Sequence, residues 1–314
     1  MMIPKEQYGR ANGMLEMAGA ASGVFAPILA GALIAPLGIA GIMIIDLVSA
    51  SVAIGTLFFA HIPQPPKTEE GREGKGGFLK EAAYGFRFIF ARPSLLGLQT
   101  IFLVGNFFSA IGFSVFAAMI LGRTGNDEII FGSVQTIGAI GGVTGGVLMS
   151  AWGGPKRRVH GVLMGWIFVS LLGQVVLGFG QSLPVWGVGI FFGALFSPVI
   201  DGPNQAIWQA KVAPDVQGRV FATRRLIAWL VLPVAQLLAG PLADKVFEPA
   251  MSAGGNLAPL FGGIIGTGPG AGISLMFIIT GFLAAMAGLA GYFFPAIRNA
   301  EDILPDHEAV IEIK

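Results

Sequence analysis

Apolar residues are concentrated in long runs along the chain, and polar residues are largely confined to the segments between them. Eight runs carry almost no charge and are long enough to cross a bilayer, which takes about 20 apolar residues in a helix. They do not show the alternation of apolar and polar positions that barrel strands require. The pattern therefore predicts eight membrane-spanning helices, over residues 14–35, 39–60, 95–121, 129–151, 161–180, 185–208, 226–243 and 272–294.

Small residues four positions apart recur in these predicted helices. The densest group lies in 138–146, which contains five glycines, and Gly19 with Gly23 forms a similar pair. Such spacing allows helix backbones to approach closely in lipid. We expect these helices to pack tightly against one another.

The basic residues are distributed unevenly among the connecting segments. Of the 19 lysine and arginine side chains, all but Arg123 and Lys245 lie at the N-terminus, in 61–92, 153–160 and 209–225, or after 295. Basic residues accumulate on the cytoplasmic side of membrane proteins. The bias predicts that both termini are cytoplasmic and that no basic residue lies inside a span.

Composition agrees with a membrane location. Hydrophobic residues make up 54% of the chain and charged residues 12%, and the mean hydropathy is +0.74. A soluble domain carries roughly twice that share of charge. The chain has no cysteine, and His61, His160 and His307 lie in separate loops without a metal-binding spacing. We therefore expect no metal, no cofactor and no enzymatic activity.

The longest predicted cytoplasmic connection, residues 61–92, has two parts. Residues 62–77 are rich in proline, glycine and charge, as a flexible linker would be. Residues 78–92 are predicted to form an amphipathic helix along the inner membrane surface. Its apolar face is built from residues at helical spacing: Phe78, Ala82, Phe86 and Phe90.

The chain also contains an internal repeat. The stretch PKEQYGRANG (4–13) resembles PDVQGRVFA (214–222), and LAGAL (29–33) resembles LAGPL (238–242). Both the Gly-Arg pairs and the Leu-Ala-Gly segments are offset by 209 residues. Four predicted helices precede the second copy and none precedes the first. If the two halves are equivalent, the intact architecture has six plus six helices and the chain lacks the first four.

Several motifs carry a resemblance to a known family. The segments are GFRFIFARPSLLGL (85–98), GGVLMSAWGGPKRR (145–158), VAPDVQGRVFA (212–222), LAGPLADKVFEPAM (238–251) and GTGPGAGISLMFIITG (266–281). Together they resemble the major facilitator superfamily, and within it the bacterial exporter branch that contains macrolide-efflux and enterobactin-exporter-like proteins. The loop at 145–158 departs from the family's charged signature at Ser150 and Trp152.

The resemblance implies a fold and a division of the chain. It implies an all-α polytopic membrane protein corresponding to helices five to twelve of a twelve-helix fold. Residues 1–60 would be the last two helices of the N-terminal half, and 61–92 the cytoplasmic linker. Residues 93–295 would be the C-terminal six-helix half, and 296–314 a cytoplasmic tail.

Two aspartates inside predicted spans are candidates for proton transfer, because ionisable side chains are costly in a membrane. Asp46 has a second interpretation, a structural hydrogen bond to a neighbouring helix. Asp201 lies between Pro198 and Gly202-Pro203, which predicts a broken or kinked segment lining a cavity. Glu16, at the start of the first span, is expected to pair with a cytoplasmic arginine.

Uncharged polar residues and loop arginines complete the candidate site. The polar residues could line the transport cavity or hydrogen-bond between helices; they are Asn106, Gln135, Asn204, Gln205 and Gln236. In the family, arginines of the cytoplasmic turns hold the inner gate closed. This role would fall to Arg10, Arg157, Arg158 and Arg219.

These features predict a proton-coupled exporter of amphipathic small molecules, of the drug, macrolide or siderophore type, that works by alternating access. We expect it in the bacterial plasma membrane, as a monomer when full length. Its partners would be the bilayer, the proton gradient and a small-molecule substrate, with no nucleic acid. The alternative is a truncated, transport-incompetent membrane protein or an incomplete gene model.

Overall fold

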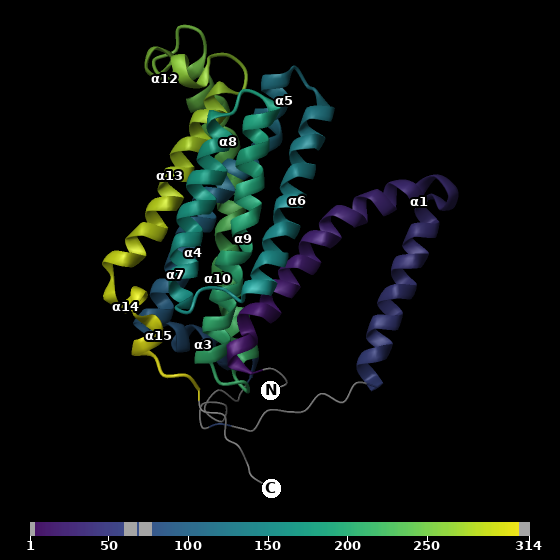
Figure 1. The fold of residues 1–314 in the computed structure, drawn as a ribbon, viewed down its shortest axis with the longest axis vertical. Helices are drawn as coiled ribbons and strands as arrows, with labels where there is room; N and C mark the ends of the chain where they lie inside the picture. Colours follow the sequence, from purple (N-terminus) through teal and green to yellow (C-terminus); the bar gives the residue numbers. More distant parts are fainter. Residues whose placement is uncertain (1–3, 60–67, 69–76, 308–314) are drawn as a thin grey trace.

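The computed structural model describes residues 4–59, 68 and 77–307, and within these ranges it contains helices and turns but no strand. In chain order the elements are the 3-10 helix η1 (Lys5–Gln7), α1 (Tyr8–Phe59), α3 (Phe78–Phe90), α4 (Pro93–Ser114), α5 (Phe116–Thr124), α6 (Glu128–Trp152), α7 (Arg158–Phe168), the π-helix η2 (Val169–Val175), α8 (Val176–Phe179), α9 (Leu183–Lys211), α10 (Gln217–Leu242), the π-helix η3 (Ala243–Phe247), α11 (Glu248–Met251), α12 (Ala258–Ile265), α13 (Ala271–Phe293), α14 (Pro295–Arg298) and α15 (Ala300–Ile303). The long helices form a bundle, with α3, α14 and α15 at one end and α12 at the other (Figure 1).

Seven helices in the described part of the chain are long and apolar enough to cross a membrane. They are Pro36–Phe59, Pro93–Thr124, Glu128–Trp152, Arg158–Phe179, Leu183–Lys211, Gln217–Met251 and Ala271–Phe293. Each overlaps one of the ranges predicted from the sequence. The remaining range, 14–35, is helical within α1 but is not one of the seven. The described residues thus give seven candidate spans where the sequence predicts eight.

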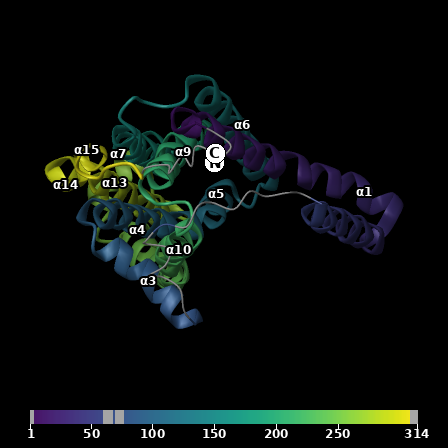
Figure 2. The same ribbon diagram turned by 90° about the horizontal axis from the view of Figure 1, so that it is seen from below.

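Helix α1 consists of two limbs that meet at Gly38. The backbone there has φ 63° and ψ 177°, which glycine adopts without the steric cost that other residues have. The first limb packs against α6 and α9. The second limb turns back and stands away from the other helices (Figures 1 and 2). The turn lies between the predicted ranges 14–35 and 39–60.

The two copies of the repeat begin equivalent helices. Helix α1 begins at Tyr8 and α10 at Gln217, which preserves the offset of 209 residues seen in the sequence. Both helices start at the end of the bundle where α15 lies and run toward the end with α12 (Figure 1). The repeat is therefore parallel, as the sequence predicts.

The glycines of α6 bring three helices together. A Cβ atom on Gly141 would lie 2.5 Å from the carbonyl oxygen of Phe191, and one on Gly145 would lie 2.2 Å from that of Leu195. A Cβ on Gly146 would lie 2.7 Å from Cα of Met17 in α1. The prediction of close packing over 138–146 is confirmed. Gly19 and Gly23 behave differently, because among the described residues no atom outside the adjoining helix backbone lies within 4 Å of a Cβ built on either.

Helix α3 packs on the bundle through a face that the sequence pattern does not single out. Tyr84, Phe88 and Ile89 are buried in a cluster with Trp208. Of the predicted apolar face, Phe90 is 60% exposed and Phe86 is partly buried. The side chains of Phe78 and Ala82 lie outside the described ones. Helix α3 therefore packs against the bundle through Tyr84, Phe88 and Ile89, and Phe90 points away from it.

Candidate functional site

One cavity is lined by Asp201 of α9. This Asp201 cavity has a volume of about 660 Å³ and is lined by side chains of α4, α7, η2, α9 and α10. Asp201 is partly buried, and the hydroxyl of Ser197 lies 3.4 Å from its Oδ2. Helix α9 is continuous across Pro198 and Pro203, so the segment is not broken, but it lines a cavity at Asp201 as the sequence predicts.

Arg224 of α10 also lines the Asp201 cavity. Its Nη1 donates to Oε1 of Gln205 at 2.6 Å, and its guanidinium carbon lies 5.1 Å from the centre of the Trp208 ring. The polar contacts from α9 and the aromatic ring compensate for taking the cation out of water.

Sequence reasoning missed Arg224 because the apolar run begins only near residue 226. The helix itself begins at Gln217, so Arg219, Arg224 and Arg225 lie within α10. Helix α10 therefore extends into the segment that the sequence assigns to a cytoplasmic connection. A signal was available: the Gly-Arg repeat places the start of α10 two turns before Arg224.

The second cavity lies between the first limb of α1, α6 and α9. This Glu16 cavity has a volume of about 720 Å³, and Glu16 is the one charged residue in its lining. Small residues form most of its walls, including Gly19, Gly23 and Gly142. The structure thus places Glu16 in a cavity and not against a cytoplasmic arginine. Ser197 lines both cavities, so they adjoin at the middle of α9.

The predicted polar residues are divided among different environments. Asn106 and Gln205 line the Asp201 cavity, and Gln135 lines the Glu16 cavity. Asn204 lines neither, because its Oδ1 accepts from Nε1 of the buried Trp208 at 3.2 Å. Gln236 is exposed on α10 and also lies outside both cavities.

Asp46 is not brought together with Asp201. It lies on the second limb of α1, is exposed, and lines neither cavity. The hydrogen bond recorded there is from the Ser49 hydroxyl to the backbone carbonyl of Asp46, at 2.9 Å. The described residues supply no contact between the Asp46 carboxylate and a neighbouring helix.

The start of α1 packs against α6 and α9 at the end of the bundle that holds the first and last described residues. A Cβ on Gly9 would lie 2.1 Å from the carbonyl oxygen of Gly153, so only glycine fits there. Asn12 Nδ2 donates to Oε1 of Gln209 at 3.0 Å. Arg10 lies against Gly153. These contacts close the bundle at this end.

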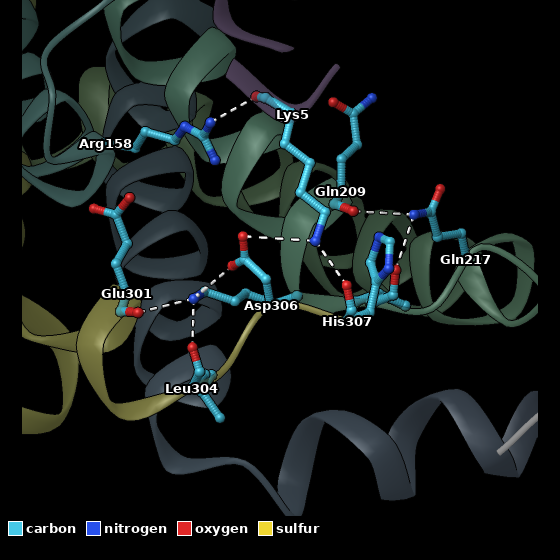
Figure 3. Close-up of polar contacts among 10 residues, drawn as sticks. Lys5, Arg158, Gln209, Gln217, Glu301, Leu304, Asp306 and His307 are labelled. Carbon is cyan, nitrogen blue, oxygen red and sulfur yellow. Dashed lines mark hydrogen bonds and ion pairs between the residues drawn. The ribbon is translucent and has the colours of Figure 1, made fainter. Parts of the chain in front are cut away.

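A group of polar contacts joins the described start and end of the chain to α9; we call Lys5, Lys211, Asp306 and His307 the tail cluster (Figure 3). Lys211 Nζ lies 2.9 Å from Oδ1 of Asp306 and donates to the carbonyl oxygens of Glu301, at 2.8 Å, and Leu304. Lys5 Nζ lies 3.7 Å from Oδ2 of Asp306 and donates to the carbonyl oxygen of His307 at 2.6 Å. One carboxylate thus bridges α9 and η1.

The predicted gating arginines surround this end. Arg158 Nη2 donates to the carbonyl oxygen of Lys5 at 2.8 Å. Arg157 Nη2 lies 3.1 Å from Oδ2 of Asp302. Arg219 Nη2 lies 3.5 Å from Oε1 of Glu81 in α3. Sequence reasoning missed Lys211 and Asp306, because both lie in charged segments that look like ordinary solvated loops.

The described residues contain no group of three histidine, cysteine, aspartate or glutamate side chains that could hold a metal ion. The cavities are of a size that holds a drug-sized molecule.

Comparisons with known proteins give a family and distant relatives. A sequence model of the Major Facilitator Superfamily matches residues 1–235. Macrolide efflux protein A of Streptococcus pyogenes is 22% identical over 254 residues, which cover 78% of this chain and 60% of that protein. Macrolide efflux protein A of Enterococcus faecalis is 22% identical over 242 residues, covering 74% of this chain and 72% of that protein. The chain thus spans about 60% of the length of the Streptococcus relative. No solved structure matches the chain.

Proposed function

Because the chain belongs to the Major Facilitator Superfamily, we propose that it acts as a secondary active exporter of amphipathic small molecules. One observation carries the proposal: two cavities of drug-sized volume adjoin at Ser197, next to Asp201, halfway along α9. A substrate in either cavity would lie within reach of an ionisable group. The names of the relatives, which refer to macrolide efflux, support export as the direction.

We propose that both termini face the cytoplasm, on the basis of the distribution of lysine and arginine. The end closed by Gly9, Asn12 and the tail cluster is then the inner end. The first limb of α1 leaves α6 as it rises from this end (Figure 1). We propose that this arrangement is the outward-facing state of an alternating-access cycle.

In this mechanism Asp201 takes up and releases the coupling proton. The hydroxyl of Ser197 lies 3.4 Å from its Oδ2, and Arg224 lines the same cavity. A proton and a cationic group compete for such a carboxylate, so binding of one favours release of the other. Arg224 compensates the charge of Asp201 when the proton has left.

Asp201→Asn tests this assignment, and the chain offers a matched control. Asp46→Asn makes the same change at an exposed carboxylate outside both cavities. Inside-out vesicles with an imposed proton gradient should accumulate a labelled macrolide with the wild type and Asp46→Asn, but not with Asp201→Asn. Equal membrane insertion of the three proteins is checked by immunoblot. Proton-driven accumulation by Asp201→Asn would refute the role.

A second candidate is that these 314 residues form a membrane protein that does not transport by itself. The most apolar window of Pro36–Phe59 has no buried residue, so this limb contributes little to enclosing a path. Reconstitution of the 314-residue chain into liposomes distinguishes an exporter from a membrane protein that does not transport by itself. A folded chain that retains ligand binding but moves no substrate would support this second candidate.

A further inference from the structure

A groove lies between α4, α13 and α14, apart from the two cavities described above. This α4–α13 groove has a volume of about 430 Å³. Thr100 carries the one polar side chain in its lining, and the Thr100 hydroxyl donates to the carbonyl oxygen of Leu96 at 2.8 Å. The lining therefore presents an apolar surface to whatever occupies the groove.

Small residues on both helices produce this groove. Ala287, Ala290 and Gly291 of α13 line it together with Gly97 of α4. A Cβ on Gly97 would lie 2.5 Å from Cγ1 of Ile297, so even a methyl group would crowd that wall. Larger side chains at these positions would fill the groove.

The groove belongs to the surface that faces lipid. Its two long walls come from the candidate spans Pro93–Thr124 and Ala271–Phe293. Large apolar side chains next to the lining residues of α13 are exposed, among them Met286 and Phe293. Such side chains are covered by lipid chains when the helix crosses a membrane. The groove is therefore continuous with the surface that the bilayer covers.

Helix α4 separates this groove from the proposed transport site. Gln99, Phe102 and Asn106 line the Asp201 cavity. Leu96 and Val104 of the same helix line the groove. A molecule in the groove thus contacts α4 on the side away from Asp201, and need not be a transported compound.

Two arginines adjoin the groove at the end of the bundle where α3, α14 and α15 lie (Figure 1). Arg92 directly precedes the lining residue Pro93, and Arg298 directly follows the lining residue Ile297. The guanidinium carbon of Arg92 lies 3.5 Å from the centre of the Phe88 ring. Arg298 is exposed, and its Nη1 donates to the carbonyl oxygen of Tyr292 at 3.3 Å. The apolar groove thus has positive charge next to it at this end.

The acidic side chains of α15 do not neutralise Arg298. Oε2 of Glu301 accepts from the backbone nitrogen of Val159 at 3.0 Å. Oδ2 of Asp302 lies 3.1 Å from Arg157. Within the described part of the chain Arg298 forms no ion pair. Its charge remains for an anion from outside the protein.

We infer that the α4–α13 groove binds an anionic phospholipid, with an acyl chain in the groove and the headgroup phosphate at Arg298. Basic residues between transmembrane helices at the cytoplasmic surface bind anionic headgroups. The cytoplasmic orientation proposed above places Arg298 at the headgroups of the inner leaflet. The inference goes beyond the proposed function, because the lipid would bind whether or not the chain exports anything.

The experiment compares two lipids that differ in headgroup charge. Phosphatidylglycerol and phosphatidylcholine with identical acyl chains are titrated onto the purified protein in detergent, and the bound lipids are counted by native mass spectrometry. Wild-type protein should bind phosphatidylglycerol more tightly. Arg298→Gln should weaken phosphatidylglycerol binding about fivefold and leave phosphatidylcholine binding unchanged, whereas Arg298→Lys should retain the preference.

Two matched pairs of variants locate the site. Arg157→Gln removes an exposed arginine at the same end but outside the groove, and should bind as the wild type does. Ala290→Leu fills the groove and should weaken binding of both lipids. Ala118→Leu makes the same change at an exposed position of α5 outside the groove, and should have no effect. The Tm of each variant is measured to show that it is folded.

Three outcomes would overturn the inference. One is equal wild-type affinity for the two lipids, which would mean nonspecific lipid contact. Another is unchanged phosphatidylglycerol binding by folded Arg298→Gln or Ala290→Leu. The third is a dimer without bound lipid that Ala290→Leu dissociates, which would mean that a second copy of the chain covers the groove.

Discussion

Lys211 Nζ lies 2.9 Å from Oδ1 of Asp306, and this contact ties the segment after α15 to the last residue of α9. The side chain of Lys211 is only 6% exposed, whereas that of Asp306 is 46% exposed. A nearly buried ammonium group needs acceptors on every side, and Asp306 is the one that carries a full charge. The same carboxylate reaches Lys5, so it holds the start and end of the described chain together.

Asp306→Asn should loosen this end of the bundle. The change keeps the shape of the side chain but removes the charge opposite Lys211. Because Asp306 is about half-exposed, we expect a loss of about 1 kcal/mol, seen as a lower Tm in detergent. Asp302→Asn is the control, because its pair with Arg157 is exposed on both sides and should contribute little. Equal effects of the two substitutions would contradict the role assigned to Lys211.

The stabilisation by Asp306 should depend on pH in a defined direction. Burial alone would raise the pKa of its carboxyl, but the hydrogen bond from Lys211 and the charges of Lys211, Lys5 and Arg158 outweigh it and lower the pKa below the ordinary 3.8. A carboxyl with a depressed pKa stabilises the folded state above its unfolded pKa, and this contribution is lost as the pH falls through the folded pKa.

The measurement is the difference in Tm between the wild type and Asp306→Asn. It should stay constant from about pH 8 to about pH 5 and shrink as the pH falls below about 4. A difference that already shrinks between about pH 7 and pH 5 would mean that another group controls the contact.

The packing of α6 on α9 should tolerate no added methyl group at Gly145. A Cβ there would lie 2.2 Å from the carbonyl oxygen of Leu195, which is backbone and cannot rotate away. Gly145→Ala should destabilise the protein by about 1–3 kcal/mol. Gly19→Ala adds the same methyl group to α1 at a position where no described atom outside the adjoining helix backbone lies within 4 Å of the new Cβ. This substitution should not lower the Tm. A harmless Gly145→Ala would contradict the close approach of the two helices.

In the proposed alternating-access cycle, the contact between Asn12 and Gln209 would have to open. The two side chains are hydrogen-bonded at 3.0 Å, and the chain has no native cysteine. Asn12→Cys with Gln209→Cys, joined by a short bis-methanethiosulfonate reagent, should stop export, and a reducing agent should restore it. Each single-cysteine variant serves as the control. Full export by completely cross-linked protein would exclude opening at this end.

Much of the fold follows from local sequence, for a physical reason. In lipid the backbone must satisfy its own hydrogen bonds, so apolar runs of sufficient length become helices wherever they occur. Seven predicted ranges accordingly overlap helices that could span a membrane, and the motif resemblance to the Major Facilitator Superfamily is confirmed. The glycines of 138–146 were informative because a missing side chain is itself a packing feature.

The charged part of the site was decided by tertiary contacts. Hydropathy averages the transfer free energy of neighbouring residues, and this average placed Arg224 in a loop. In the structure Arg224 lies inside the bundle, where Gln205 and the Trp208 ring of α9 contact its guanidinium group. The prolines beside Asp201 predicted a cavity there, and of Asp46 and Asp201 only Asp201 lines one. The sequence by itself determined the helices and the parallel repeat. Only the tertiary structure determined which charged side chains form ion pairs, because these pairs link residues far apart in the chain, such as Lys5 and Asp306.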